Sequence, residues 1–292
     1  MNPDVAFPIW SGERAQRVAA VLDGCLPPAD EPPETLHRAM RYSVLSGGKR
    51  VRALLAYAAG EFAGGDPSVV DAAAAAVELI HAYSLIHDDL PCMDDDVLRR
   101  GRPACHVAYG EPMALLAGDA LQALAFEVLA KAHVPDGISV LARSAGSRGM
   151  AGGQAFDLAS TGAVLAVDEL ERMHRLKTGA LIGAAVRLGA ACGPPLNAAQ
   201  ERALDRCASA VGLAFQVVDD VLDVEGTAQS LGKTAGKDAA QQKPTYVSVM
   251  GLAAARELIL KLRVEAHSAL ADSGRGARRL GEIVDWLTAR SN

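Results

Sequence analysis

Aromatic residues are scarce in this 292-residue sequence, and that scarcity bears directly on its fold. Phe, Trp and Tyr make up only 4% of the chain, whereas alanine fills stretches such as "DAAAAAVELI" at 71–80. Alanine and leucine lead the scale of helix propensity, while aromatic and β-branched residues favour strands. The composition therefore predicts an all-α protein.

Paired cysteines, a targeting signal and a membrane span are also missing. The five cysteines are odd in number and form no C-x-x-C pair, so neither a zinc site nor a disulfide framework is expected. A signal peptide has a basic segment followed by an apolar one, and the opening "MNPDVAFPIW" has neither, so we expect no signal peptide. The sequence has no run of about 18 uncharged apolar residues, so we expect no membrane span. We expect reduced thiols and a cytoplasmic location.

Basic residues are not in excess, because 29 Lys and Arg face 35 Asp and Glu for a net charge of -6. This balance argues against nucleic acid as a partner. Gly- and Pro-rich breakers divide the chain into helix-sized pieces, with no repeat and no low-complexity linker. We predict one domain over 1–292, a bundle of ten or more helices. Only the segment 225–244 lacks periodicity at length, which is typical of a lid or binding loop.

The acidic residues, by contrast, are concentrated. In "LIHDDLPCMDDDVLRRG", at 85–101, Asp88 and Asp94 are six residues apart. On an ideal helix that spacing would turn them roughly 240° away from each other. Pro91 lies between them and would break or bulge the helix. Such a bulge can bring Asp94 back beside Asp88.

A second acidic cluster follows an apolar helix in "FQVVDDVLDVEG". Asp219 and Asp223 are four apart and would share one helix face. Acidic runs are more often solvated faces, but here two clusters each end an apolar helix, where close carboxylates need cations or protons. All candidate ligands are oxygens, which suits Mg²⁺. An EF-hand is excluded, because Arg99 stands where that loop needs glycine.

Basic side chains stand near glycines or the acidic clusters. In "SGGKRVR" the paired glycines allow backbone to approach an anion closely, and lysine and arginine are the usual partners of phosphate oxygens. Each residue alone is more often a surface charge, but together with Mg²⁺-binding carboxylates they predict a site for two polyanions. They are Lys49, Arg50, Arg52, Arg99, Arg100, Lys177, Lys233, Lys237 and Lys243.

Six ordered blocks between 47 and 246 carry a family resemblance: "GGKRVR", "ELIHAYSLIHDDLPCMDDDVLRRG", "GMAGGQAFDL", "HRLKTGALI", "FQVVDDVLDVEG" and "LGKTAGKDAAQQKPTY". The chain resembles the trans-isoprenyl diphosphate synthases, most closely the bacterial farnesyl diphosphate synthases. The resemblance implies an all-α isoprenoid-synthase fold around a central cavity, and a homodimer. It also implies head-to-tail joining of isopentenyl diphosphate to dimethylallyl or geranyl diphosphate, with three Mg²⁺ ions, to give farnesyl diphosphate.

The resemblance also implies roles for individual residues. The implied catalytic set is Asp88, Asp89, Asp94, Lys177, Asp219 and Lys233. The implied metal ligands are Asp88, Asp94 and Asp219, with Asp223, Asp220 and Asp238 nearby or acting through water. Contacts to the allylic diphosphate are implied for Arg99, Lys177, Thr178, Gln216, Lys233 and Lys243, and contacts to isopentenyl diphosphate for Lys49, Arg52, His81 and Arg100. His81 could also be a hydrogen-bonded core histidine, and His87 is expected to be structural.

Product length is the finer question. Tyr83 lies five residues before Asp88, roughly 7.5 Å deeper along a helix, where its ring can form the floor of a tail pocket. Tyr83 and its neighbour Ser84 resemble the positions that limit bacterial enzymes to fifteen carbons. Geranyl or geranylgeranyl diphosphate are the alternative products. Ala53, Ala104 and Pro244 depart from the family's usual residues and affect individual contacts only.

Three other functions remain open. A class I terpene cyclase would share the fold and the first acidic motif, although its second motif usually mixes Asn, Ser and Glu. A metal-dependent phosphohydrolase is loosely suggested by the spacing of His81, His87 and Asp88, but further histidine ligands are missing. A catalytically silent partner subunit is the third alternative, against which both acidic motifs are complete.

Overall fold

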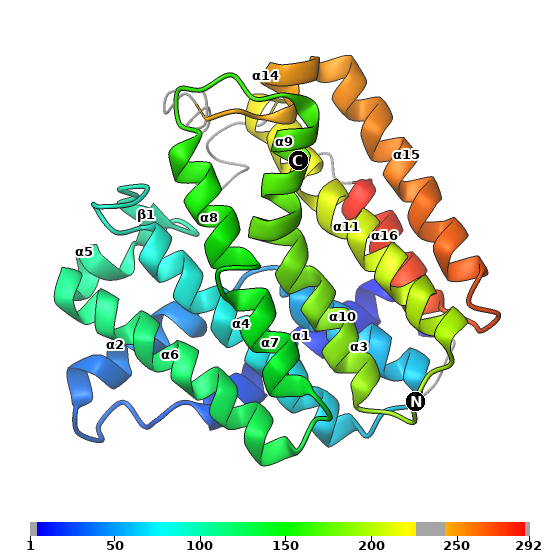
Figure 1. Cartoon of the computed structure of the whole chain (residues 1–292). Helices are drawn as coiled ribbons and strands as arrows, with labels where there is room; N and C mark the ends of the chain where they lie inside the picture. The colour runs from blue at the N-terminus through cyan, green and yellow to red at the C-terminus, as the bar shows by residue number, and fades with distance from the viewer. Residues whose placement is uncertain (1–4, 226–242, 290–292) are drawn as a thin grey trace.

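The computed structural model describes residues 5–225 and 243–289, and these are almost entirely helical (Figure 1). The all-α prediction, with more than ten helices, is confirmed. The elements in chain order are α1 (Phe7–Cys25), α2 (Glu34–Val44), α3 (Val51–Ala63), α4 (Pro67–Asp88), β1 (Leu98–Arg99), β2 (Arg102–Pro103), α5 (Cys105–Tyr109), α6 (Glu111–Ala132), α7 (Gly137–Ala145), α8 (Met150–Ala159), α9 (Val167–His174), the π-helical turn η1 (Arg175–Gly179), α10 (Ala180–Ala191), α11 (Ala198–Glu225), α14 (Tyr246–Met250), α15 (Leu252–Ala271) and α16 (Arg278–Thr288).

Small residues let the central helices pack closely. Helix α4 contacts α3, α6 and α10, and its run Ala73–Ala76 is completely buried. Helices α3 and α10 approach so closely that a Cβ added at Gly189 would lie 2.1 Å from the carbonyl oxygen of Ala56. The alanine-rich composition is therefore the composition of a tightly packed helical core.

Local signals fix where α4 begins. Helix α3 ends at Gly64, which adopts the left-handed conformation (φ 74°) that glycine tolerates. Asp66 then caps α4 by accepting a hydrogen bond from the backbone N–H of Ser68, at 2.8 Å, and Pro67 occupies the first helical position. This boundary sets the register that places Asp88 at the last residue of the helix.

The second long helix, α11, completes the frame of the site. It packs against α10 on one side, and Figure 1 shows it beside α15 and α16 on the other. Its apolar residues, including Val217 and Val218, are buried, and its last turns carry Asp219, Asp220 and Asp223. Two buried helices, distant in sequence, therefore both end in carboxylates. The residues Lys233, Lys237 and Asp238 lie outside the described residues.

Two helices are apolar enough to bear on the expectation that the chain has no membrane span. Helices α4 and α6 are each long and apolar enough to cross a membrane, judged by length and composition alone. In α4, 67% of the apolar window is buried inside the protein, so core packing explains its composition. In α6 only 33% is buried, which leaves an apolar face without a cover in the single chain.

Candidate active site

A cavity of about 580 Å³ lies between α4, α8, η1 and α11, a size that suits a small organic ligand. Asp88 on α4 and Asp219 on α11 both line it, so the ends of the two acidic helices face one hollow. The other lining residues are Arg52, His81, Tyr83, Ser84, Leu85, His87, Met93, Arg99, Arg100, Met150, Ala151, Gln154, Ala155, Leu158, Lys177, Thr178, Phe215 and Gln216.

The first acidic cluster folds back on itself after α4. The backbone N–H of Asp94 donates to the carbonyl oxygen of Asp88 at 2.8 Å, and Asp95 takes a positive φ of 49°. This turn brings Asp94 beside Asp88, as the bulge hypothesis at Pro91 required. Burial raises the pKa of Asp88 to about 6; Lys177 opposes the shift, and the neighbouring Asp94 adds to it.

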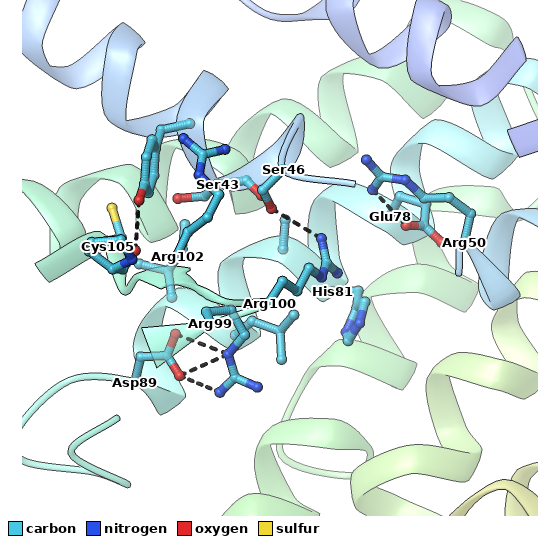
Figure 2. A pocket seen from close by; sticks show the side chains of 15 residues that line it. Ser43, Ser46, Arg50, Glu78, His81, Asp89, Arg99, Arg100, Arg102 and Cys105 are labelled. Atoms are coloured by element: carbon cyan, nitrogen blue, oxygen red, sulfur yellow. Dashed lines mark hydrogen bonds and ion pairs between the residues drawn. The ribbon is translucent and has the colours of Figure 1, made fainter. Parts of the chain in front are cut away.

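Asp89 is directed differently from Asp88. Figure 2 shows its carboxylate accepting from the guanidinium of Arg99, with Nε 3.1 Å from each oxygen. Asp89 is only 2% exposed, and its burial raises the pKa of the carboxyl while Arg99 lowers it. A forked contact of this kind orients the arginine. Asp89 therefore acts on the cavity through Arg99, which lines it.

The second acidic cluster divides its roles between neighbours. Asp219 lines the cavity, whereas Asp220 is 2% exposed and accepts hydrogen bonds from Gln216 Nε2 and from the backbone N–H of Tyr246, both at 2.8 Å. Asp220 thereby ties α11 to the start of α14. Asp223, one turn further along, is buried and is not among the cavity-lining residues.

Two lysines predicted to contact the allylic diphosphate are paired with carboxylates. Lys177 Nζ lies 2.5 Å from Asp157 Oδ2. Lys243 Nζ lies 2.7 Å from Asp94 Oδ1 and 3.8 Å from Asp157 Oδ2. Asp94, Asp157 and the two lysines thus form one charge network, of which Lys177 lines the cavity. Thr178, beside Lys177, donates to Gln216 across to α11 at 3.2 Å.

Sequence reasoning missed two residues, one that lines the cavity and one that pairs with the lysines beside it. Asp157 joins both lysines, and Gln154 lines the cavity with its Nε2 lacking a hydrogen-bond partner among the described residues. Both stand in the block "GMAGGQAFDL", whose glycines were the available signal. A Cβ at Gly153 would lie 2.1 Å from the backbone nitrogen of Lys177, so only glycine lets α8 reach η1.

A second group of basic residues lies behind Asp88, at the base of the glycine-rich loop. Arg52, His81 and Arg100 line the cavity together, whereas Lys49 is exposed and is not among the lining residues. Arg100 donates to Ser46 Oγ at 3.2 Å (Figure 2) and also to the carbonyl oxygen of Gly47. Burial and the nearby arginines lower the pKa of His81 well below 6.5, so its ring is neutral at pH 7.

Part of the cavity wall comes from α4 residues that precede Asp88. Tyr83 and Ser84 both line the cavity, and the ring of Tyr83 meets that of His87 edge-on at 5.7 Å. His87 Nε2 lies 3.0 Å from the carbonyl oxygen of Leu115, which links α4 to α6. His87 therefore supports the wall that Tyr83 forms, in addition to lining the cavity itself.

The arrangement of the carboxylates suits Mg²⁺, which needs few protein ligands, better than a metal ion whose ligands all come from the protein. Among residues 5–225 and 243–289, no group of three or more His, Cys, Asp or Glu side chains is close enough to hold an ion. Asp88 and Asp219 nevertheless line one cavity, and the raised pKa of Asp88 marks a buried carboxylate that a cation would stabilise. Mg²⁺ commonly takes one or two carboxylates and completes its shell with water and substrate phosphates.

Comparison with known proteins identifies the family. The polyprenyl synthetase model matches residues 33–273, and the chain belongs to this family. It is 47% identical over 289 residues to a probable farnesyl diphosphate synthase of Bradyrhizobium diazoefficiens (96% of this chain, 87% of the relative). It is 48% identical over 263 residues to the farnesyl diphosphate synthase of Escherichia coli (86% of this chain, 88% of the relative).

A solved structure gives the same result for the fold. The geranyltransferase of Helicobacter pylori, complexed with magnesium and isoprenyl diphosphate, superposes with a TM-score of 0.84 at 30% identity, covering 98% of each chain. The predicted isoprenoid-synthase fold is therefore confirmed.

The contacts of the second acidic cluster predict that two adjacent substitutions affect stability to different extents. Asp220→Asn should lower the free energy of unfolding by about 1–3 kcal/mol, because it weakens two buried hydrogen bonds to a charged group. Asp219→Asn should leave stability within about 0.5 kcal/mol, since this carboxylate faces the cavity. Urea unfolding measures both. Equal losses of stability would contradict the division of roles.

Proposed function

We propose that the chain is a farnesyl diphosphate synthase, which condenses isopentenyl diphosphate head-to-tail with dimethylallyl and then geranyl diphosphate. One observation carries the proposal: carboxylates from two distant helices, one lysine, three arginines and several apolar side chains line a single cavity. The relatives named above support the farnesyl product, and geranyl and geranylgeranyl diphosphate are the alternatives. The cytoplasmic location and the single domain over 1–292 remain part of the proposal.

The reaction begins when the C–O bond of the allylic diphosphate breaks and the diphosphate leaves with the electron pair. Asp88, Asp94 and Asp219 would hold Mg²⁺, with Asp223 as a further candidate. When bound, the ions, three by family analogy, would neutralise charge that develops on the leaving diphosphate. Arg99, held in direction by Asp89, adds positive charge from this chain.

The ion pairs that the lysines form in the absence of substrate are consistent with this reaction. Lys177 is paired with Asp157 and Lys243 with Asp94, so the charge of each partly buried lysine is compensated. A diphosphate would supply the lysines with new partners, and a cation would do the same for the carboxylates. Thr178, Gln216 and the amide of Gln154 also line the cavity and could form hydrogen bonds with the oxygens of the diphosphate. Lys233 belongs to the proposed contacts but lies outside the described residues.

The second substrate would bind beside Arg52, His81 and Arg100, with Lys49 at the entrance. Its double bond attacks the allylic cation, a new C–C bond forms, and a proton leaves to give the longer allylic diphosphate. Tyr83, Met150 and Phe215 contribute apolar wall to the same cavity. Such a wall excludes water, which would otherwise capture the cation.

The decisive experiment is product analysis. With Mg²⁺, isopentenyl diphosphate and geranyl diphosphate, we expect farnesyl diphosphate and inorganic diphosphate, identified by chromatography and mass spectrometry. Chelation by EDTA should lower the rate at least about a hundredfold, and added Mg²⁺ should restore it, because the leaving group loses its main stabilisation. A hydrocarbon product would instead indicate a cyclase, and phosphate alone a hydrolase.

Product length should depend on Tyr83. Tyr83→Ala removes the ring at the deep end of the cavity, so we expect products of twenty carbons or more beside farnesyl diphosphate. Tyr83→Phe is the matched control, because it keeps the ring and should keep the fifteen-carbon product. Chromatography of the dephosphorylated products measures both. An unchanged distribution in the alanine variant would refute Tyr83 as the floor.

We also propose that the chain is a homodimer, joined through the outer face of α6. Leu115 and Leu116 on that face are 48% and 46% exposed, and most of the apolar window of α6 is not buried within one chain. A second copy presenting the same face would cover it. Light scattering should give twice the chain mass of 30.3 kDa.

One substitution tests the dimer. Leu116→Glu should give a monomer, since it places a charge in the apolar contact. Leu260→Glu on α15 is the matched control, because Leu260 is also exposed (60%) but lies on a different helix, and it should leave the mass unchanged. A monomeric unmodified chain, or a dimer unaffected by Leu116→Glu, would overturn the proposal.

A further inference from the structure

Glu78 is a buried carboxylate to which neither motif reasoning nor the proposed reaction gives a role. It stands on α4, one turn before His81, and is only 3% exposed. Arg50, Arg52 and Arg100 all lie near it. Glu78 raises the pKa of Arg52 and of Arg100 against the lowering effect of their burial. A carboxylate so placed keeps the surrounding arginines charged.

Its two oxygens bind the last residue of the loop that precedes α3 and the first turn of α3 itself. Oε2 accepts from Arg50 Nη1 at 3.0 Å, and Oε1 accepts from the backbone N–H of Ala53 at 3.1 Å (Figure 2 shows the pair with Arg50). Arg50 also donates through Nη2 to the carbonyl oxygen of Val44 at 2.7 Å. The pair therefore joins the end of α2, the first turn of α3 and the middle of α4.

The segment between these anchors depends on contacts from other parts of the chain: Arg100 donates to Ser46 Oγ and to the carbonyl oxygen of Gly47, and the Glu78–Arg50 pair holds its end. Gly47 and Gly48 have positive φ values of 85° and 111° and no side chains to pack. Arg50 itself adopts a left-handed φ of 50°, which is uncommon for a residue with a Cβ and persists only when its surroundings hold it. Arg52 follows directly on the first turn of α3, so its direction depends on that turn.

We propose that Glu78 and Arg50 are positioning residues for isopentenyl diphosphate. Their buried ion pair fixes the glycine-rich loop and the first turn of α3, and so aims Lys49 and Arg52 at the homoallylic diphosphate. This inference rests on the proposed function, because it assigns that substrate to the group formed by Arg52, His81 and Arg100. Neither Glu78 nor Arg50 needs to touch the substrate.

Charge and position predict opposite signs for one substitution. Glu78→Gln removes a negative charge near the anion site, and charge alone would then tighten binding of a diphosphate. Loss of the anchor would instead release the loop and weaken binding. We expect position to dominate, because a small misplacement of oriented groups costs large factors in rate and affinity. The sign of the change therefore discriminates between the two roles.

The experiment compares KM values for the two substrates in the full-length protein. Glu78→Gln should raise KM for isopentenyl diphosphate about tenfold or more, with KM for geranyl diphosphate within about twofold and kcat largely retained. Arg50→Lys should show the same selectivity, since lysine keeps the charge but cannot reach Glu78 and Val44 together. This second variant decides the matter if Glu78→Gln does not fold.

Glu61→Gln is the matched control. Glu61, near the far end of α3, accepts from Trp10 Nε1 at 2.8 Å and from Arg14 at 3.2 Å, so it also anchors this helix, but away from the cavity. It should leave both KM values unchanged. A lower KM for isopentenyl diphosphate in Glu78→Gln, equal rises for both substrates, or the same rise in Glu61→Gln would overturn the inference.

Calorimetric titration with isopentenyl diphosphate separates this inference from the proposed function. If the unmodified protein yields no condensation product, the proposed function fails. Binding of isopentenyl diphosphate to it, weakened in Glu78→Gln and Arg50→Lys but not in Glu61→Gln, would still support the positioning role. Absence of binding to the unmodified protein would overturn both.

Discussion

Compensation of buried charge is the constraint on which the rest of this structure depends. Carboxylates and cations that converge on a partly desolvated cavity are unstable unless each has a counter-charge. The chain meets this requirement by pairing Lys177 with Asp157, Lys243 with Asp94, and Arg99 with Asp89. These groups come from four places in the chain: the segment after α4, helix α8, the turn η1 and the segment before α14.

The fold could be predicted from sequence because its cause is local. Alanine-rich segments with breakers such as Gly64 and Pro67 specify helices and their ends, and long apolar helices ending in acid indicate a common cavity. Ordered motifs then predicted which carboxylates and basic residues face it. Asp88, Asp219, Lys177 and Thr178 line one cavity, as those motifs indicated.

What could not be predicted is non-local. Asp220 has the same sequence context as Asp219, but it is buried and accepts a hydrogen bond from the backbone of Tyr246, 26 residues away. The glycines in the block of Asp157 indicate a close approach to another element, but they do not say that the carboxylate would meet Lys177. From the sequence Glu78 is an ordinary helical glutamate, and only the fold brings Arg50 and the first turn of α3 to it. Such roles depend on contacts between elements, which periodicity does not encode.

The close approach of α3 and α10 has a consequence for how related enzymes could diverge. Where Gly189 faces Ala56, the two helices touch through main-chain atoms, with no side chain between them to trim or enlarge. This contact lies outside the residues that line the cavity, so main-chain packing fixes the frame around it, whereas the length of the cavity depends on side chains that line it, such as Tyr83. Evolution of new chain lengths on this scaffold would proceed by exchanging side chains at the bottom of the hollow, without rebuilding the bundle.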